Sequence, residues 1–320
     1  MAQYLYTYKP LDLAVRSIRL LRLVHGSYHE DIQTEIFEAW LDELDCLMPY
    51  EALSYVWGST SEGNMVPINI DGSVKRVTGN LREALRHLRD KHCDRILWVD
   101  AICIDQENDL EKGHQVKHMG RIYKQAERVV AWLGTSTKET DEAISEMNEL
   151  VEQFWPFKYG QEDQGKEKSH VLDHQVGLIQ LLCSPWFERV WILQEVANAR
   201  VADMVCGNKS ISGWKLALVT SHLLGYQVPT HCQAVLDILP GNARKHSWWS
   251  KKPDLYTLLK KFRHSSATDP RDKIFALLGL ASDASQSEFL QADYTRDFTY
   301  VASRTTFFLL SWRFIYKRIP

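Results

Sequence analysis

A short apolar run that breaks abruptly into polar side chains constrains this sequence most. Residues 96–99 are apolar and partly β-branched, which predicts a buried strand. Asp100, Cys103, Asp105 and Gln106 follow it directly. Ligands of open α/β sheets gather just past the carboxyl ends of strands, so these side chains mark a candidate site. Alternatively, they cap the following helix and satisfy buried amide groups.

Strand-like and helix-like stretches alternate along much of the chain. Short apolar runs predict strands at residues 18–24, 32–37, 50–57, 66–70, 74–77, 96–99, 128–133 and 201–206. Amphipathic stretches predict helices at residues 81–91, 109–126, 141–154, 176–183, 185–197, 214–224, 231–239, 255–263, 273–280 and 299–314. Asp71-Gly72 favours a type I′ hairpin turn, and Asn80 is placed to cap the first helix.

This alternation predicts an α/β fold with a mixed, partly parallel sheet flanked by helices, followed by a mostly helical C-terminal third. We expect residues 1–210 to form the α/β core. Residues 211–320 are expected to form a helical part packed on that core, so that the two make one structural unit. The polar, charged stretch at residues 156–169 predicts a loop.

Charge and hydropathy exclude several classes of partner. The chain carries 38 basic and 41 acidic side chains, well mixed, and no basic stripe that would predict a nucleic-acid surface. No apolar run approaches the roughly 20 residues that span a bilayer, and the N-terminus lacks the features of a secretory signal. Six cysteines without a CxxC pair are typical of a reducing compartment, so we expect a cytoplasmic protein.

The common motifs for nucleotides, metals and hydrolytic nucleophiles are missing: GxGxxG, GxxxxGK[ST], GxSxG and HExxH. His114/His118 and His170/His174 are spaced to share a helix face, but no third ligand is suitably placed, so we expect no metal site. Apolar neighbours make Cys103 a buried thiol rather than a nucleophile. No cofactor is expected.

Several long blocks together resemble the fungal HET (heterokaryon incompatibility) domain. They are YEALSYVWG at 50–58, NLREALRHLR at 80–89, the block from LWVDAICIDQ to AWLG at 97–134, PWFERVWILQEVANAR at 185–200 and ATDPRDKIFALLGLA at 267–281. Two departures stand out. Asp105 occupies a position where the family often has Asn, and Glu111–His114 replaces a Glu-Arg pair. The family has been likened to TIR domains, which implies a distantly TIR- or Rossmann-like sheet.

The blocks suggest one shared site. Tyr55 and Trp57 end one predicted strand, Asp100 ends its expected neighbour, and Trp191 and Glu195 share a helix face. We expect the catalytic residues to be Asp100, Glu195 and Arg189. The expected substrate-binding residues are Tyr55, Trp57, Cys103, Asp105, Gln106, Trp191 and Gln194. A structural alternative is that Arg189 pairs with a carboxylate and holds its helix on the sheet.

Three functions are compatible with the sequence. The resemblance implies an effector of fungal nonself recognition whose activation triggers cell death, acting through a pocket around Asp100 and Glu195. If the TIR likeness extends to NAD cleavage, one of these carboxylates would stabilise a ribosyl oxocarbenium ion. The second is a cofactor-independent enzyme of fungal secondary metabolism, because eleven tryptophans could line a pocket for cyclisation or a pericyclic reaction of a terpenoid or polyketide. The third is a non-catalytic interaction module. The expected partner is accordingly a small molecule or another protein.

Overall fold

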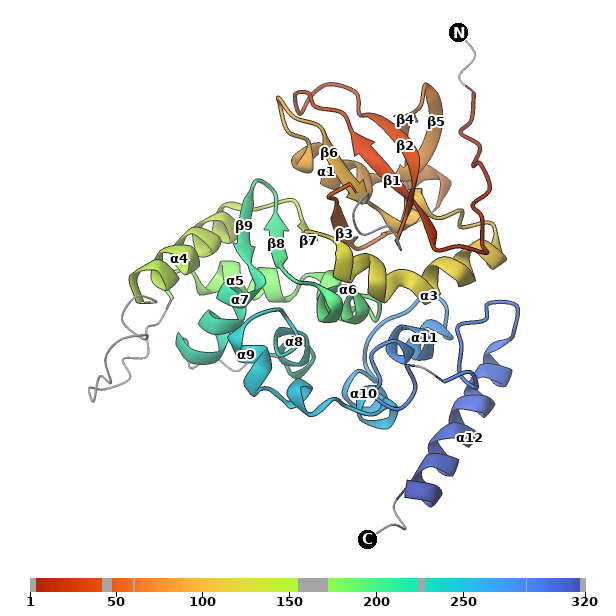
Figure 1. The fold of residues 1–320 in the computed structure, drawn as a ribbon. Helices are drawn as coiled ribbons and strands as arrows, with labels where there is room; N and C mark the ends of the chain where they lie inside the picture. The colour runs from red at the N-terminus through yellow and green to blue at the C-terminus, as the bar shows by residue number, and fades with distance from the viewer. Residues whose placement is uncertain are drawn as a thin grey trace, which may run out of the picture.

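The structure is a computed structural model that describes residues 4–41, 48–59, 61–154, 172–223, 228–285 and 287–316. Its central feature is a nine-stranded sheet (Figure 1). The strands are β1 (Ser17–Leu23), β2 (Gln33–Trp40), β3 (Glu51–Tyr55), β4 (Met65–Ile70), β5 (Ser73–Thr78), β6 (Arg95–Trp98), β7 (Arg128–Gly134), β8 (Ala202–Cys206) and β9 (Lys209–Ser212). Their order in the sheet is β5-β4-β2-β1-β6-β3-β7-β8-β9.

Four adjacent strands form a parallel block in the order β6-β3-β7-β8. Outside this block β2 and β4 are parallel, while β1, β5 and β9 run antiparallel to their neighbours. Strand β3 lies between β6 and β7, both of which come later in the chain. The predicted α/β class with a mixed, partly parallel sheet is confirmed.

The middle strands are apolar on both faces because helices and loops cover both faces of a parallel sheet. Ala52, Leu53 and Tyr55 of β3 are all buried, and so is the run of β7 from Val129 to Trp132. By contrast, β2 is buried only at Thr34 and Ala39 and has four exposed residues, so it is less enclosed than the middle strands.

The predicted hairpin turn is also confirmed. Strands β4 and β5 pair up to Ile70 and Ser73, which leaves Asp71 and Gly72 as the two turn residues. Their φ angles are 51° and 78°. A type I′ turn needs positive φ at both positions, which explains the Asp-Gly sequence.

Twelve α-helices are described. They are α1 (Gly79–Leu88), α2 (Asp100–Cys103), α3 (Asp109–Gln125), α4 (Lys138–Phe154), α5 (Gln175–Leu182), α6 (Ile192–Asn198), α7 (Gly213–Leu218), α8 (Thr230–Leu236), α9 (Asn242–His246), α10 (Leu255–Lys261), α11 (Asp272–Leu278) and α12 (Phe298–Tyr316). Helices α3 and α6 lie between the sheet and the helices α8, α10 and α11 of the C-terminal third (Figure 1). Within the described ranges, no helix has the length and apolar character needed to cross a membrane.

One predicted helix is wrong in a way that matters for the site. Residues 185–197 form a 3₁₀ turn, Pro185–Glu188, and then α6, instead of one continuous helix. Arg189 between them is extended, with φ −70° and ψ 136°. The cause is tertiary, because the backbone around Arg189 pairs with Ser266 in the C-terminal third. Val190 N donates to Ser266 O at 3.0 Å.

The expected cap of the first helix is also wrong. Thr78 caps α1 by accepting a hydrogen bond from Leu81 N, and it lies two positions before the expected cap, Asn80. Asn80 instead donates to Val56 O and accepts from Trp132 Nε1, which joins α1 to the ends of β3 and β7. The loop predicted at 156–169 lies outside the described residues. The division into 1–210 and 211–320 stays a prediction.

A buried ion pair joins β1 to the start of α3. Arg19 and Glu111 are 4% and 2% exposed and form two hydrogen bonds, of 2.6 and 3.0 Å. The Arg19 guanidinium also donates to Cys103 O, and Glu111 Oε1 accepts from Asp105 N. The ring of Tyr8 covers the guanidinium, 4.8 Å from its centroid. The pair therefore fixes the segment between β6 and α3.

We predict that Arg19→Met lowers the free energy of unfolding by about 3–5 kcal/mol, because it leaves the Glu111 carboxylate buried without its partner. The double variant Arg19→Met/Glu111→Leu is expected to recover a large part of the loss. Urea denaturation measures both. Arg22→Met serves as the control, because Arg22 and Glu35 form an ion pair that is 39% and 54% exposed, and its loss is expected to cost less than about 1 kcal/mol. Equal losses for Arg19→Met and Arg22→Met would refute the prediction.

Candidate functional site

The candidate site lies at the carboxyl ends of three parallel strands, β6, β3 and β7. β3 pairs with β6 through Ala52 and Trp98, and with β7 through Tyr55 and Trp132. The chain therefore passes from the end of β3 toward Trp57, and from the end of β6 into α2, at the same edge of the sheet. This is the edge where α/β proteins commonly bind ligands.

Asp100, the first residue of α2, connects these strand ends. Its Oδ2 accepts a hydrogen bond from Trp57 Nε1 at 2.8 Å, and its Oδ1 accepts one from Ala101 N at 2.7 Å. Gln106 Nε2 donates to the main-chain oxygen of Asp100 at 2.9 Å. Burial raises the pKa of the Asp100 carboxyl, while the positive charge of Arg189 and the two hydrogen bonds act in the opposite direction.

Glu195, in the first turn of α6, lies near Asp100 and the end of β3. Its side chain is 1% exposed, and its Oε1 lies 3.9 Å from Arg189 Nη1. Arg189 Nη1 also donates to Tyr55 O at the end of β3. Because Arg189 lies in the extended break before α6, its side chain reaches both the helix and the sheet. The structure thus brings Asp100, Arg189 and Glu195 into one cluster with Tyr55 and Trp57.

The ionisation of Glu195 is strongly perturbed. The pKa of its carboxyl is raised to about 7, and burial is the largest cause. Arg189 and a hydrogen bond from Ser54 lower the pKa, whereas the charge of Asp100 raises it. Within the described residues, Glu195 Oε2 has no hydrogen-bond partner. A carboxyl with a pKa near neutrality can both donate and accept a proton at physiological pH.

Two members of the cluster, Ser54 and Tyr123, were not predicted from the sequence. Ser54 Oγ accepts a hydrogen bond from Trp186 Nε1 at 2.7 Å and lies next to Glu195. The buried hydroxyl of Tyr123 donates to Leu53 O at 3.4 Å, and its environment includes the charges of Glu195 and Asp100. A signal for Ser54 was present, since a lone hydroxyl inside the apolar run of a central strand must find a partner.

Two of the expected substrate-binding residues point elsewhere. Cys103 is fully buried, and burial raises the pKa of its thiol to about 12, so it is a neutral core residue at physiological pH. The carboxylate of Asp105 accepts a hydrogen bond from Glu107 N, and its backbone joins the Arg19–Glu111 pair. Both residues therefore belong to the turn between α2 and α3.

Trp191 and Gln194 connect α6 to the C-terminal third. Trp191 hydrogen-bonds the buried carboxyl of Asp272, which also accepts from Tyr294 Oη at 2.6 Å. Gln194 Nε2 donates to Phe275 O at 3.3 Å. Trp191 is in helical conformation and its main-chain oxygen accepts from Glu195 N at 3.4 Å, but the two side chains have different partners, Asp272 for Trp191 and Arg189 for Glu195.

No metal centre is found among the residues that the structure describes, since no three His, Cys, Asp or Glu side chains come together suitably. The rings of His114 and His118 do meet, 4.6 Å apart. Burial lowers the pKa of both imidazoles, that of His118 to about 4. His170 lies outside the described residues.

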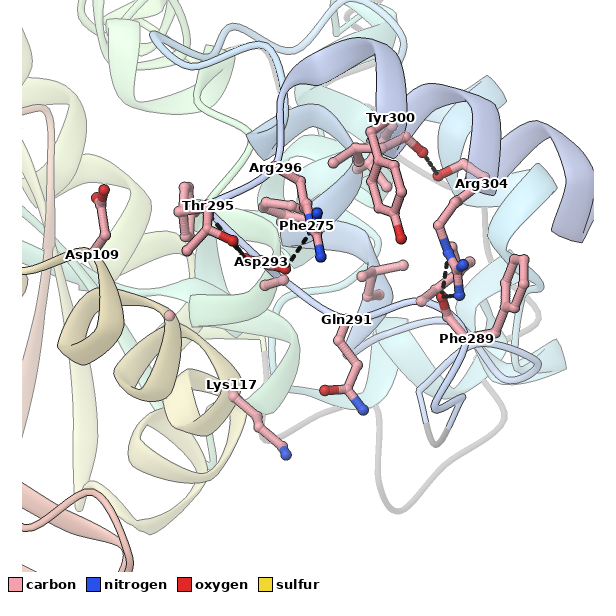
Figure 2. Close-up of a pocket in the computed structure, with 18 of the residues that line it drawn as sticks. Asp109, Lys117, Phe275, Phe289, Gln291, Asp293, Thr295, Arg296, Tyr300 and Arg304 are labelled. Atoms are coloured by element: carbon pink, nitrogen blue, oxygen red, sulfur yellow. Dashed lines mark hydrogen bonds and ion pairs between the residues drawn. The ribbon is translucent and has the colours of Figure 1, made fainter.

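Two adjoining cavities lie between α3 and the C-terminal third. One has a volume of about 450 Å³ and lies between α3 and the segment that leads into α12 (Figure 2). The other, of about 640 Å³, is lined by later residues of α3 and by Gln194 and Asn198 of α6. Helix α6 thus carries Glu195 in the cluster and two polar side chains in a cavity wall.

Comparison with known proteins gives a consistent result. The family described as Heterokaryon incompatibility protein (HET) matches residues 50–195, a range that includes every member of the cluster. The chain is 27% identical to "Heterokaryon incompatibility protein 6, OR allele" of Neurospora crassa over 357 aligned residues. This alignment covers 92% of the chain and 52% of the relative, so the chain spans about half of the relative's length. No solved structure matches.

We predict that Glu195→Gln becomes more stable relative to the wild type as the pH rises from 4.5 to above 7. In this range the unfolded wild type has lost the Glu195 proton that the folded state retains, so its stability falls with rising pH. A rise in the pKa from 4.5 to about 7 corresponds to roughly 3 kcal/mol. Urea denaturation at several pH values measures the difference. The exposed Glu188 supplies the control Glu188→Gln, which should follow the wild-type curve, and parallel curves for Glu195→Gln would contradict the prediction.

Proposed function

The chain carries a heterokaryon incompatibility domain at residues 50–195 and is a member of the fungal HET family, and from this we propose that it acts as an effector of fungal nonself recognition. The support is the family match and the name of the Neurospora relative. In this proposal its activation leads to cell death, and the cluster of Asp100, Arg189 and Glu195 is the site of action.

The observation that carries the site is the Glu195 carboxyl. It is almost completely buried, one of its oxygens has no hydrogen-bond partner among the described residues, and its distance from the Arg189 guanidinium is long for an ion pair. Burying a carboxyl with incomplete compensation costs stability. Groups of this kind gather at functional sites, where a perturbed pKa is needed for chemistry.

The cluster offers three distinct chemical groups. Glu195 can transfer a proton near neutral pH, Arg189 supplies a permanent positive charge, and Asp100 supplies a second carboxyl held by Trp57. Such a set suits the cleavage of a glycosidic bond, in which one carboxylate stabilises an oxocarbenium ion. We propose NAD as the substrate to be tested first.

No comparable observation favours a cyclase. That function would be supported by an enclosed apolar pocket lined by Trp and Tyr. Trp57 and Trp186 instead use their indole N–H groups to bind Asp100 and Ser54. The two cavities along α3 have charged side chains in their walls.

The test is regulated expression in a fungal host. Wild-type protein is expected to arrest growth, and Glu195→Gln is expected to raise the number of surviving colonies at least tenfold, because the amide cannot exchange a proton. Cellular NAD, measured by mass spectrometry, should fall with the wild type and stay constant with the variant.

Asp272→Asn is the matched control. It also alters a buried carboxyl, but Asp272 lies outside the cluster, where an amide oxygen can still accept the hydrogen bond from Tyr294. We expect it to arrest growth as the wild type does at equal protein levels. If Glu195→Gln still kills, the site is refuted. If the wild type kills and Glu195→Gln does not, but NAD stays constant in both, the proposal of NAD as the substrate is refuted and the proposal of the site is retained.

A further inference from the structure

The two cavities along α3 form one continuous groove, which we call the α3 groove. Several side chains line both cavities, among them Lys117 on one wall and Phe275, Leu278, Leu290 and Gln291 on the other. The lining on α3 extends from Asp109 to Lys124. At about 1.5 Å per helical residue the groove is roughly 22 Å long.

One rim of the groove is basic. Lys117, Arg121 and Lys124 lie at positions i, i+4 and i+7 of α3, which is one face of the helix. All three are exposed, and they line the larger cavity, where Glu288 is the one carboxylate in the lining. Within the described ranges Lys117 and Lys124 form no ion pair. The groove thus gathers positive charge on a chain whose net charge is −3.

At the other end of the groove, two arginine side chains are already bound to groups within the protein. Arg304 donates to Phe289 O at 2.9 Å, and Arg296 lies 3.5 Å from the Asp293 carboxylate. Figure 2 shows these pairs, with Lys117 and Gln291 extending from opposite walls toward the same open side. This end of the groove also contains the carboxylates of Asp109 and Asp293, so the surplus of positive charge lies on the part of the rim that carries Lys117 and Lys124.

The floor of the groove is apolar. Phe275 and Leu278 of α11 and Leu290 are buried beneath the rim and line both cavities. An occupant would therefore place apolar groups on these three side chains and negative charges beside α3. It would also need more than one negative charge, because Lys117 and Lys124 are roughly 10 Å apart along the helix axis.

We infer that the α3 groove binds an extended acidic segment of a partner protein, with carboxylates at the rim of α3 and apolar side chains on the floor. A single small anion would engage only one of Lys117 and Lys124, because seven helical residues separate them by roughly 10 Å along the axis. Single-stranded nucleic acid would match the charges, but it needs several aromatic rings on which successive bases stack, and among the described residues the larger cavity, where these cations lie, is lined by one aromatic side chain, Phe275. This inference does not depend on the chemistry proposed for Glu195.

The test measures binding of defined peptides by fluorescence anisotropy at low salt, with the full chain. The probe is a fluorescein-labelled octapeptide of the sequence Glu-Leu-Glu-Glu-Leu-Glu-Glu-Leu. It is expected to bind at least tenfold more tightly than the peptide in which Gln replaces every Glu. The double variant Lys117→Glu/Lys124→Glu should raise its Kd at least tenfold, since two attractions become repulsions.

Two further variants separate the groove from general surface charge. Lys138→Glu reverses an exposed lysine on α4, outside the groove, and should change the Kd less than twofold. Gln291→Trp fills the groove at an exposed position without changing its charge and should weaken binding at least fivefold. Thermal melting confirms that each variant is folded.

The inference is overturned if the Glu and Gln peptides bind equally, or if Lys138→Glu weakens binding as much as the double variant. It is also overturned if Gln291→Trp has no effect. An oligothymidine of ten nucleotides that displaces the acidic peptide and binds more tightly would assign the groove to nucleic acid instead.

Discussion

The bidentate pair of Arg19 and Glu111 is the interaction on which much of this structure depends. Arg19 comes from the antiparallel strand β1, whereas Glu111 opens the long helix α3. Between them the chain passes the end of β6 and the turn that begins with Asp100. Because both charges are buried, neither can be accommodated without the other. The pair therefore fixes where α3 starts relative to the sheet, and with it the edge that carries the cluster and one wall of the α3 groove.

Local sequence patterns predicted most of the sheet. The strands of the parallel block, the Asp71-Gly72 turn and helix α3 are encoded by apolar runs, by a dipeptide that tolerates positive φ and by helical periodicity. Strand β9 was missed, because its four residues carry only one buried side chain. It forms by pairing with β8 after a turn at Gly207, which is a tertiary effect.

The candidate site was only partly predictable for the same reason. Asp100 and Trp57 follow strand ends, and that position can be read from sequence. Helical spacing placed Trp191 beside Glu195 and Arg189 on the same helix, but pairing with Ser266 interrupts that helix. Arg189 consequently turns toward Tyr55, while the side chains of Trp191 and Gln194 bind the C-terminal third. Local periodicity cannot predict this break, because Ser266 lies 77 positions after Arg189.

The bridge between Arg189 and Ser266 also sets the order in which a newly made chain can complete the cluster. The ribosome finishes Glu195 well before it adds Ser266, and at about 5–20 residues per second the interval is several seconds. During that time α6 and the strands of the parallel block can already be packed, but the backbone that positions Arg189 has no partner. A nascent chain is therefore without a finished site until the C-terminal third has been synthesised and folded.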